Sequence, residues 1–496
     1  MQLPPKHILS KSTFMKGCQC PKALWLNKFQ PELKTAVSAQ QQAIFDRGTN
    51  VGKLAEQLFP GGVDARPENA YSYQQSVVDT FQFIQLGHEV IYEAAFQYNQ
   101  VLAALDILVK KDGMWKAYEV KSSTSISDAI LQDAALQYYV ITQSGLPLVD
   151  FSIVTINTSY IKNGEIDVFQ LFKIESVLDQ VLQLQPMISL KIEELKNSLK
   201  QTEMPIRDIG AYCNSPYPCD FKQYCWKHIP DNSVFDLMGY ASASKAFDLY
   251  KKGIVLLSDI PADFKLTENQ EIQVSVHKTQ VPKVNLPALD SFKKQLVYPL
   301  YFMDFETYQS AVPELDGTKP YQQIPFQYSV HRLDSPNAAL VHFEWLGESG
   351  TDPRNEFLNN LLNVTDNNGS VIVYNGSFES SRLKELAFWF PQKAAEIEAL
   401  QNRMLDLMGP FQKKHYYLPQ MNGSYSIKEV LPALVPSLSY DNLEIGNGSD
   451  ASASYYQLQF ENDNVVVENT RQALLKYCML DTLAMVKILE KVNDIK

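Results

Sequence analysis

The spacing of apolar residues along the first 200 positions changes period several times. Four segments carry apolar side chains at helical spacing: residues 31–58, 71–86, 126–144 and 171–200. Residues 88–121 instead suggest three strands, with Lys111-Asp112-Gly113 as a hairpin turn between the last two. Residues 148–157 form a further apolar strand pattern. The pattern predicts helices, then a strand meander, a helix and a buried strand.

The second half of the chain alternates strand and helix patterns. Strands are expected at 298–307, 324–333, 339–346 and 370–376, and helices at 353–363, 377–390 and 467–492. This alternation is typical of a mixed α/β sheet. Residues 231–297 instead suggest short helices and loops ending in a proline-containing stretch. We therefore expect an α/β multidomain protein with segments 1–230, 231–297 (a helical connector) and 298–496.

The composition permits several ordinary cores and restricts the class of protein. The chain has 496 residues, 45% of them apolar and 20% charged, which suggests two to four domains. No apolar run approaches the roughly 18 residues of a membrane helix, and the N-terminal residues lack a secretory pattern. We expect a cytoplasmic protein with no membrane partner. The net charge of −12 argues against coating nucleic acid by bulk charge, but a metal-dependent nuclease needs its own acids.

One candidate centre lies in the strand meander. Asp106 falls in an apolar strand pattern, and Glu119 and Lys121 follow two positions apart on another strand, which places both on one face. A hairpin would bring Asp106 close to that face. Two carboxylates could hold a divalent cation, with Lys121 steadying the developing charge on a phosphate. An ordinary salt bridge beside a hairpin explains these residues about equally well.

The cysteines suggest a second kind of centre. They are Cys18, Cys20, Cys213, Cys219, Cys225 and Cys478. In a cytoplasmic protein, clustered cysteines indicate a metal before a disulfide. The three between 213 and 225 need a fourth ligand, for which Cys20 is expected and Cys18 is the alternative. Their wide spacing is less typical of zinc and favours an iron–sulfur cluster, and inert buried thiols are the other explanation. Cys478 is expected to be a core residue.

A third candidate centre lies in the second half. Asp304 and Glu306 are two apart in a strand pattern, Glu379 begins a predicted helix, and Tyr477 and Asp481 are four apart in the last one. Four such acids could surround two Mg²⁺ or Mn²⁺ ions about 3.5–4 Å apart, with Tyr477 orienting the attacking water. Unrelated cap and surface carboxylates would be the alternative.

The first of these centres resembles a known nuclease core. Asp106 and Glu119-Val120-Lys121, with the preceding Glu93, are similar to PD-(D/E)XK nucleases, above all to the iron–sulfur RecB-like exonucleases. The resemblance implies that Gln137, in the following helix, belongs to the site. It also implies one cluster cysteine ahead of the nuclease core and three after it, holding a [4Fe–4S] cluster.

The sequence differs from the family pattern at one expected metal ligand. Gly52 lies near the position where the family usually has a first-helix histidine. Glu56 or Glu93 could substitute for that histidine.

The second-half motifs resemble another family. Asp304-x-Glu306, Asn375-Gly-Ser-Phe378-Glu379 and Tyr477-x-x-x-Asp481 are similar to the three motifs of DEDD exonucleases, DnaQ-like proteins of the ribonuclease H fold. Glu379 stands where aspartate is usual, and Asp406 is a further candidate for a supporting role. The stretch resembles an uncharacterised bacterial domain family of this superfamily, often joined to a RecB-like nuclease.

These resemblances imply a fusion of two nuclease domains. Residues 1–230 would be an iron–sulfur PD-(D/E)XK domain, and residues 298–496 a 3′–5′ exonuclease-like DEDD domain. The expected activity is Mg²⁺- or Mn²⁺-dependent hydrolysis of phosphodiester bonds, with DNA, especially single-stranded ends, ahead of RNA. A role in DNA repair or defence is implied by analogy alone. An RNA exonuclease and a nucleic-acid-binding scaffold with inactive sites remain the alternatives.

Overall fold

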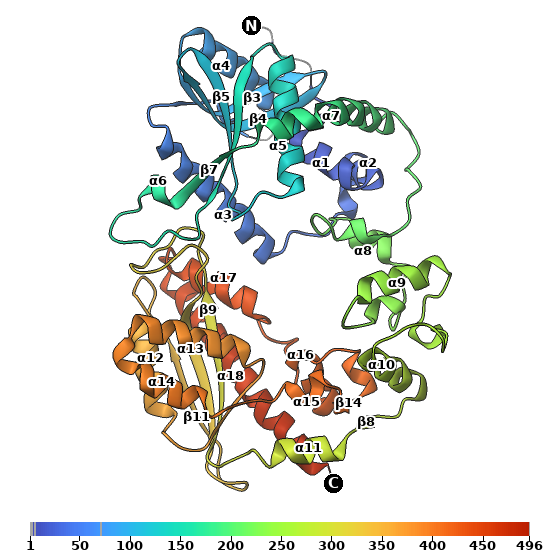
Figure 1. Cartoon of the computed structure of the whole chain (residues 1–496), viewed down its shortest axis with the longest axis vertical. Helices are drawn as coiled ribbons and strands as arrows, with labels where there is room; N and C mark the ends of the chain where they lie inside the picture. The colour runs from blue at the N-terminus through green and yellow to red at the C-terminus, as the bar shows by residue number, and fades with distance from the viewer. Residues whose placement is uncertain (1–2, 4–5, 70–71, 496) are drawn as a thin grey trace. The chain divides into compact units, whose positions relative to one another are not determined.

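The computed structural model describes residue 3, residues 6–69 and residues 72–495. Figure 1 shows its helices and strands in chain order. Of the helix expected at 71–86, residue 71 lies outside the described residues, and α4 (Tyr73–Gln85) forms from the rest. Within the described ranges, no helix combines the length and the apolar character needed to cross a bilayer.

The chain divides into two compact units, each with its own mixed sheet. The first unit contains Met1–His228 and Ser310–Tyr321, and the second contains Ile229–Gln309 and Gln322–Lys496. The expected α/β multidomain architecture is confirmed at this level. The segment 231–297, expected to be a connector, belongs to the second unit.

The first unit contains a seven-stranded sheet. Its strands are β1 (Leu9–Ser10), β2 (Val63–Asp64), β3 (Val90–Tyr98), β4 (Val101–Lys111), β5 (Met114–Val120), β6 (Leu148–Ile156) and β7 (Phe172–Ser176). The order is β2-β3-β4-β5-β6-β7, with β1 paired to β4. The β4–β5 hairpin turns at Asp112 and Gly113, whose φ angles of 53° and 79° are those that a two-residue hairpin turn requires. The meander and its turn therefore form as the pattern predicts.

Strand β7 corrects one expectation. Residues 171–200 were expected to be helical throughout, but Phe172–Ser176 pair antiparallel with β6 before α7 (Leu178–Ser198) begins. Of the β7 side chains, Phe172 alone is buried. An edge strand that buries so little carries almost no apolar alternation, so the pattern did not reveal it.

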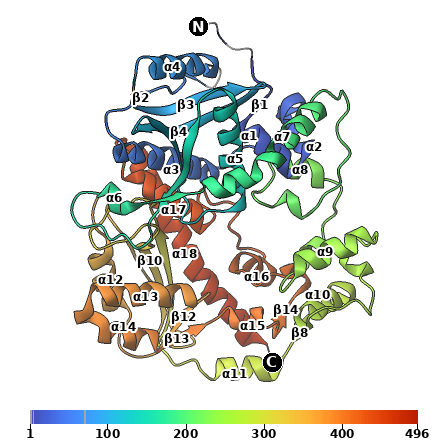
Figure 2. The ribbon, with the colours of Figure 1, turned by 45° about the horizontal axis from the view of Figure 1, so that its top comes forward.

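Helices cover both faces of this sheet. They are α1 (Lys11–Gln19), α2 (Pro21–Phe29), α3 (Ala39–Ala55), α4, α5 (Asp128–Gln143), α6 (Val168–Leu171), α7 and α8 (Lys222–Trp226). Figure 2 shows α1, α5 and α7 gathered on one side, where Leu136 and Ile192 pack against sheet residues such as Leu105. On the other face, α3 packs through Val51 and Ala55.

The second unit contains a five-stranded sheet and a two-stranded one. The larger has β9 (Leu300–Tyr308), β10 (Ile324–Leu333), β11 (Val341–Leu346), β12 (Ser370–Val373) and β13 (Met404–Asp406), in the order β11-β10-β9-β12-β13. Strands β9, β10 and β11 are antiparallel neighbours, whereas β12 runs parallel to β9 and β13 to β12. The smaller sheet pairs β8 (Lys283–Val284) with β14 (Tyr416–Tyr417).

Side-chain alternation along β9 separates a core face from a polar face. The helices of this unit are α9 (Ser242–Lys251), α10 (Glu268–Thr279), α11 (Leu286–Lys293), α12 (Arg354–Val364), α13 (Ser377–Trp389), α14 (Ala394–Gln401), α15 (Gly409–Gln412), α16 (Ile427–Leu434), α17 (Gly448–Leu458) and α18 (Asn464–Asp494). Tyr301, Met303 and Phe305 pack into the core formed with α12, α13 and α14. Asp304 and Glu306 point to the opposite face, where α18 packs.

Residues 310–321 leave the second unit between β9 and β10 and join the first. Ala311 is buried in the same cluster as Val51 and Ala55. Lys162 and Asp316 form an ion pair at 2.7 Å. The expected domain limits at 230 and 298 do not include this excursion, because its short apolar contacts have no periodic pattern.

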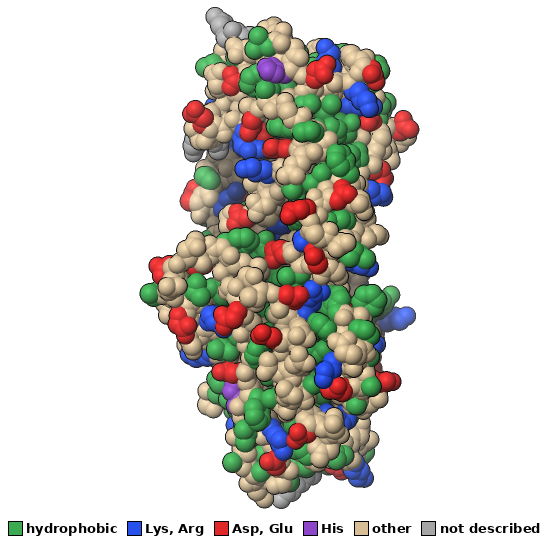
Figure 3. Space-filling model, turned by 90° about the vertical axis from the view of Figure 1, so that its left-hand side faces the viewer, with side chains coloured by type: hydrophobic (Ala, Val, Ile, Leu, Met, Phe, Trp, Pro, Cys, Tyr) green, Lys and Arg blue, Asp and Glu red, His purple; other side chains and the backbone are tan. Residues whose placement is uncertain are grey.

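Charged side chains are mixed over the surface drawn in Figure 3. Acidic and basic groups lie interspersed on that face. Although the net charge is −12, this face therefore carries no broad region of negative charge.

Candidate functional sites

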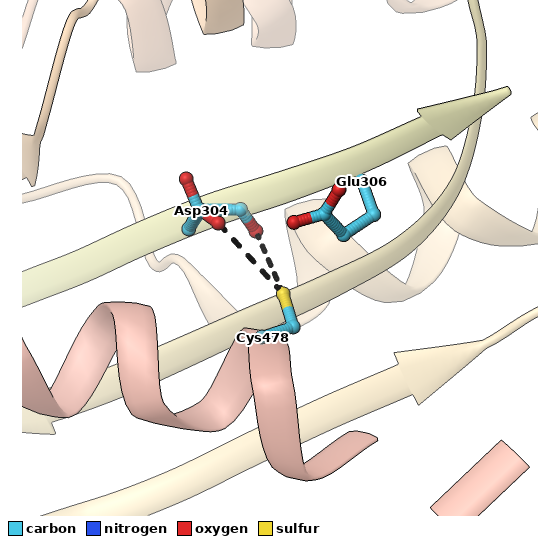
Figure 4. Close-up of side chains that lie close together, drawn as sticks. All are labelled: Asp304, Glu306 and Cys478. Carbon is cyan, nitrogen blue, oxygen red and sulfur yellow. Dashed lines mark hydrogen bonds between the residues drawn. The ribbon is translucent and has the colours of Figure 1, made fainter. Parts of the chain in front are cut away.

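Strand β9 and helix α18 bring three candidate ligands together in the second unit. Asp304 and Glu306 lie on one face of β9, and Cys478 projects from α18 towards them (Figure 4). Their ligand atoms all lie within 4.8 Å of one another. The Cys478 Sγ is 3.9 Å from the Asp304 carbonyl oxygen and from Oδ2. Cys478, expected to be a core residue, is indeed buried, and it packs directly against this acidic pair.

Two more predicted carboxylates lie beside this group. Glu379 is in the first turn of α13 and 1% exposed, and Asp481 is on α18 and 7% exposed. Asp481, Glu306 and Glu379 all act electrostatically on Asp304. Tyr477 is one turn before Asp481 on α18 and is buried as well. The predicted acids, distant in sequence, thus lie near one another between β9, α13 and α18, with Glu379 and Asp481 outside the group whose ligand atoms are all within 4.8 Å.

The four carboxyl groups lack enough positive charge to balance them. Burial, followed by mutual repulsion, raises the pKa of Asp304 and of Glu306 well above the usual range. Burial raises the pKa of Glu379 to about 8 and that of Asp481 to about 6. The Oε2 atom of Glu379 has no hydrogen-bond partner among the described residues. Such a set of hard oxygen donors fits Mg²⁺ or Mn²⁺.

Asp406 organises the turn that carries Glu379. Its carboxylate accepts hydrogen bonds from the backbone N–H groups of Asn375 (3.1 Å), Gly376 (3.1 Å) and Met408 (2.9 Å). Asn375 adopts a left-handed backbone conformation, with φ of 73°. The supporting role expected for Asp406 is therefore to fix the β12–α13 turn.

Sequence reasoning missed Tyr440 and Lys428 in this site. The Tyr440 hydroxyl donates a hydrogen bond to Asp481 Oδ1 at 2.6 Å. The Lys428 Nζ lies 5.5 Å from the ring centroids of both Tyr440 and Tyr477. Its charge lowers the pKa of Glu306 and Asp481, although burial outweighs this effect. Both residues lie on or after α16, at no fixed spacing from the acids, so no motif could have indicated them.

The first unit brings Asp106, Glu119 and Lys121 together as predicted. Asp106 Oδ2 accepts the Val120 N–H at 2.6 Å, and Lys121 Nζ donates to Glu119 Oε1 at 2.7 Å. Burial and the nearby Glu119 raise the pKa of Asp106 to about 8. Burial also acts on Glu119, but two lysines overcome it and lower the pKa of that carboxyl to about 2.

The second of those lysines, Lys11, was missed, as was Asp133. Lys11 Nζ lies 2.6 Å from Glu119 Oε1, and Lys121 Nζ lies 2.8 Å from Asp133 Oδ2. Gln137, the residue implied by the resemblance, is fully buried and donates to Asp133 Oδ1 at 3.4 Å. Asp133 lies one turn before Gln137 on α5, a helical spacing that could have indicated it.

Both residues that could substitute for the absent histidine already form ion pairs with an arginine. Glu56 and Glu93 both contact Arg66, at 3.0 Å and 3.4 Å. A Cβ atom at Gly52 would meet no described atom within 4 Å outside its chain neighbours and its own helix backbone.

The four cysteines expected to act as ligands line one pocket in the first unit. They are Cys20, Cys213, Cys219 and Cys225. Cys18 instead packs against the main core, and burial raises its pKa to about 11. Among the described residues, no three of these sulfur atoms lie within 4.8 Å of one another. Around one zinc ion, sulfurs 2.3 Å from the metal would be about 3.8 Å apart, so these sulfur atoms are not all as close together as a tetrahedral zinc site requires.

Comparisons with known proteins find similarity to a domain of unknown function and to uncharacterised proteins. Residues 301–426 match a domain of unknown function, DUF2779. The chain is 29% identical over 239 residues to the uncharacterised protein UU173 of Ureaplasma parvum, covering 44% of this chain and 34% of that protein. It is 28% identical over 226 residues to the uncharacterised protein MG366 of Mycoplasma genitalium, covering 42% and 33%. The chain thus spans about a third of the length of the curated relatives it matches.

Proposed function

We propose that this protein is a divalent-metal-dependent nuclease whose hydrolytic centre is formed by Asp304, Glu306, Glu379 and Asp481. One observation carries the proposal: four carboxyl groups from three separate elements converge, nearly buried, with too little positive charge to balance them. Buried anions are retained in proteins when they are paired or bind a metal. The mixed sheet with helices on both faces also supports a DEDD exonuclease domain of the ribonuclease H fold.

The side chains around these acids suit phosphodiester hydrolysis. When bound, two divalent cations would supply charge neutralisation at the attacking and leaving oxygens. Burial and nearby carboxylates raise the pKa of Tyr477 beyond its usual range, so its hydroxyl stays protonated. That hydroxyl hydrogen-bonds to Asp481, and its oxygen can accept a hydrogen bond from the attacking water and orient it. Tyr440 holds Asp481 through its 2.6 Å hydrogen bond and fixes the direction of that carboxylate.

A cleavage assay tests the proposal. The full chain is incubated with end-labelled single- and double-stranded DNA and RNA, in Mn²⁺ or in EDTA. We expect Mn²⁺-dependent cleavage of single-stranded DNA, which Asp304→Asn reduces at least about a hundredfold. Asp334→Asn, which changes an exposed aspartate paired with Arg332, is the matched control and leaves the rate unchanged. Full activity in the Asp304→Asn variant would overturn the proposal, and faster cleavage of RNA would change its substrate.

For the first unit we propose an iron–sulfur, RecB-like PD-(D/E)XK domain that holds the nucleic-acid strand. The four cysteines lining one pocket support a cluster there, since thiolates are the ligands that iron–sulfur clusters use. They come from the N-terminal helices and from the segment after α7, so the cluster would fasten these two ends of the unit together. Protein purified without oxygen should be brown and contain about four iron and four sulfide ions per chain. Colourless protein that binds one zinc ion instead would overturn this assignment.

A further inference from the structure

The first centre contains a lysine ammonium group in contact with its most buried carboxylate. Lys11 Nζ lies 2.6 Å from Glu119 Oε1 and 3.8 Å from Asp133 Oδ2. The Lys11 side chain is 30% exposed, whereas that of Glu119 is 1% exposed. Lys11 therefore reaches inwards from the mouth of the centre to its most buried carboxylate.

The local fold fixes Lys11 in this place. Strand β1 pairs through Ser10 and Leu102 with β4, the strand that carries Asp106. Ser10 then caps α1, with its backbone N–H donating to the Thr13 hydroxyl at 2.8 Å. Lys11 is the first residue of that helix. Because both the preceding strand β1 and the helix α1 are held in place, the fold itself positions Lys11 against Glu119.

Two carboxylates of this centre are already paired with lysine ammonium groups. Glu119 Oε1 receives the ammonium groups of Lys11 at 2.6 Å and Lys121 at 2.7 Å. Asp133 lies near the same two groups, at 3.8 Å and 2.8 Å. Glu119 and Asp133 thus face two ammonium ions, and Asp106, whose Oδ2 accepts a backbone N–H, is the third carboxyl group of the centre. A divalent cation placed on Glu119 would lie close to both positive groups and be repelled by them.

The second centre has the opposite balance. Four carboxyl groups meet there, and the charge of Lys428 does not keep their pKa values from rising. The two centres of the chain therefore differ in how far their carboxyl groups are paired with positive charge.

We propose that Lys11 occupies the divalent-cation position at Glu119, so that the first centre binds no Mg²⁺ or Mn²⁺ while Lys11 remains in place. This inference rests on the proposed function in one respect, because it assigns catalytic metal binding to the second unit alone. Glu119 Oε2 has no hydrogen-bond partner among the described residues. Oxygen donors of Glu119 and Asp106 would thus become available to a metal if Lys11 were removed.

Manganese binding tests this inference without an activity assay. The background is the full chain with Asp304→Asn and Glu306→Gln, which removes the second centre. Free Mn²⁺ is measured by electron paramagnetic resonance during titration. We expect no binding in the background up to about 1 mM Mn²⁺. Adding Lys11→Met should create one site per chain, with affinity at least about tenfold tighter, because a charge-assisted hydrogen bond no longer has to be broken.

Further variants identify the site that is gained. Glu119→Gln should abolish the binding created by Lys11→Met, and Lys11→Arg should create none. Lys16→Met is the matched control, since Lys16 is on the same helix but pairs with Asp220 outside the centre. It should leave Mn²⁺ binding unchanged.

Two results would overturn the inference. One is Mn²⁺ binding by the background that Glu119→Gln removes. The other is a folded Lys11→Met variant that gains no site. If Lys11→Met does not fold, the inference is still tested in the wild-type chain, where Glu119→Gln should leave the number of bound Mn²⁺ ions unchanged. Metal binding at Glu119 would leave the Asp304→Asn cleavage result untouched, so the two proposals fail separately.

Discussion

The substitution Glu379→Gln tests the unbalanced charge of the second centre. Glutamine keeps the size of the side chain and removes its ionisation. Burial raises the pKa of Glu379 from 4.5 to about 8 in the folded chain. A carboxyl group whose pKa is raised on folding stabilises the protein fully below pH 4.5. This stabilisation is lost as the pH rises towards 8, because the carboxyl group ionises more easily in the unfolded chain than in the folded one.

The shift gives the size of the effect. A difference from 4.5 to about 8 corresponds to roughly 5 kcal/mol, at 1.36 kcal/mol per unit, as an upper bound. Without metal, Glu379→Gln should therefore match the wild type near pH 4.5 and be more stable by up to about 5 kcal/mol at pH 9. With saturating Mn²⁺ the order should reverse, because the wild type gains binding energy through a ligand that glutamine supplies poorly.

Differential scanning calorimetry in EDTA at pH 4.5, 7 and 9 measures this difference on the transition of the second unit. For a unit of this size, 1 kcal/mol moves the midpoint by about 2–4 °C, so the predicted change is easily resolved. Glu398→Gln, an exposed glutamate on α14, is the matched control and should show no pH-dependent gain. If Glu379→Gln were no more stable than the wild type at pH 9 in EDTA, the charge at this position would be compensated and the reasoning refuted.

Three further predictions follow from single contacts. Tyr440→Phe removes the hydrogen bond that lowers the pKa of Asp481, so the acidic limb of the pH–rate profile should move up by about one unit. Asp406→Ala leaves three backbone N–H groups without their acceptor and should destabilise the second unit by about 2–4 kcal/mol in calorimetry. Cys225→Ser should lose the brown colour of anaerobically purified protein, whereas Cys18→Ser, outside the pocket, should keep it.

The parts of the site that lie on regular elements could be predicted from the sequence. Asp304 and Glu306 share a face because strand side chains alternate, and Phe305 between them faces the core. Tyr477 and Asp481 share a helix face for the analogous reason. The hairpin that joins Asp106 to Glu119 was visible because Asp112-Gly113 suits a two-residue turn.

The remaining site residues depend on long-range contacts that leave no periodic signal. Lys11 reaches Glu119 across 108 positions of sequence, and Tyr440 reaches Asp481 across 41. Neither residue has a fixed spacing to its partner, because the intervening chain sets the distance only after folding. Strand β7 was missed for a different reason, since a mostly exposed edge strand lacks the apolar alternation that marks a strand.

The excursion at residues 310–321 matters for anyone who wishes to express half of this chain. A fragment that starts after His228 would keep residues 310–321 but lose the apolar surface on which Ala311 is buried. The newly exposed apolar side chains should make the fragment prone to aggregation. The strand ends on either side offer a remedy, because Tyr308 is already paired with Ile324 across β9 and β10. Replacing the loop between β9 and β10 with a short Asn-Gly turn should therefore give a fragment of the second unit that does not aggregate.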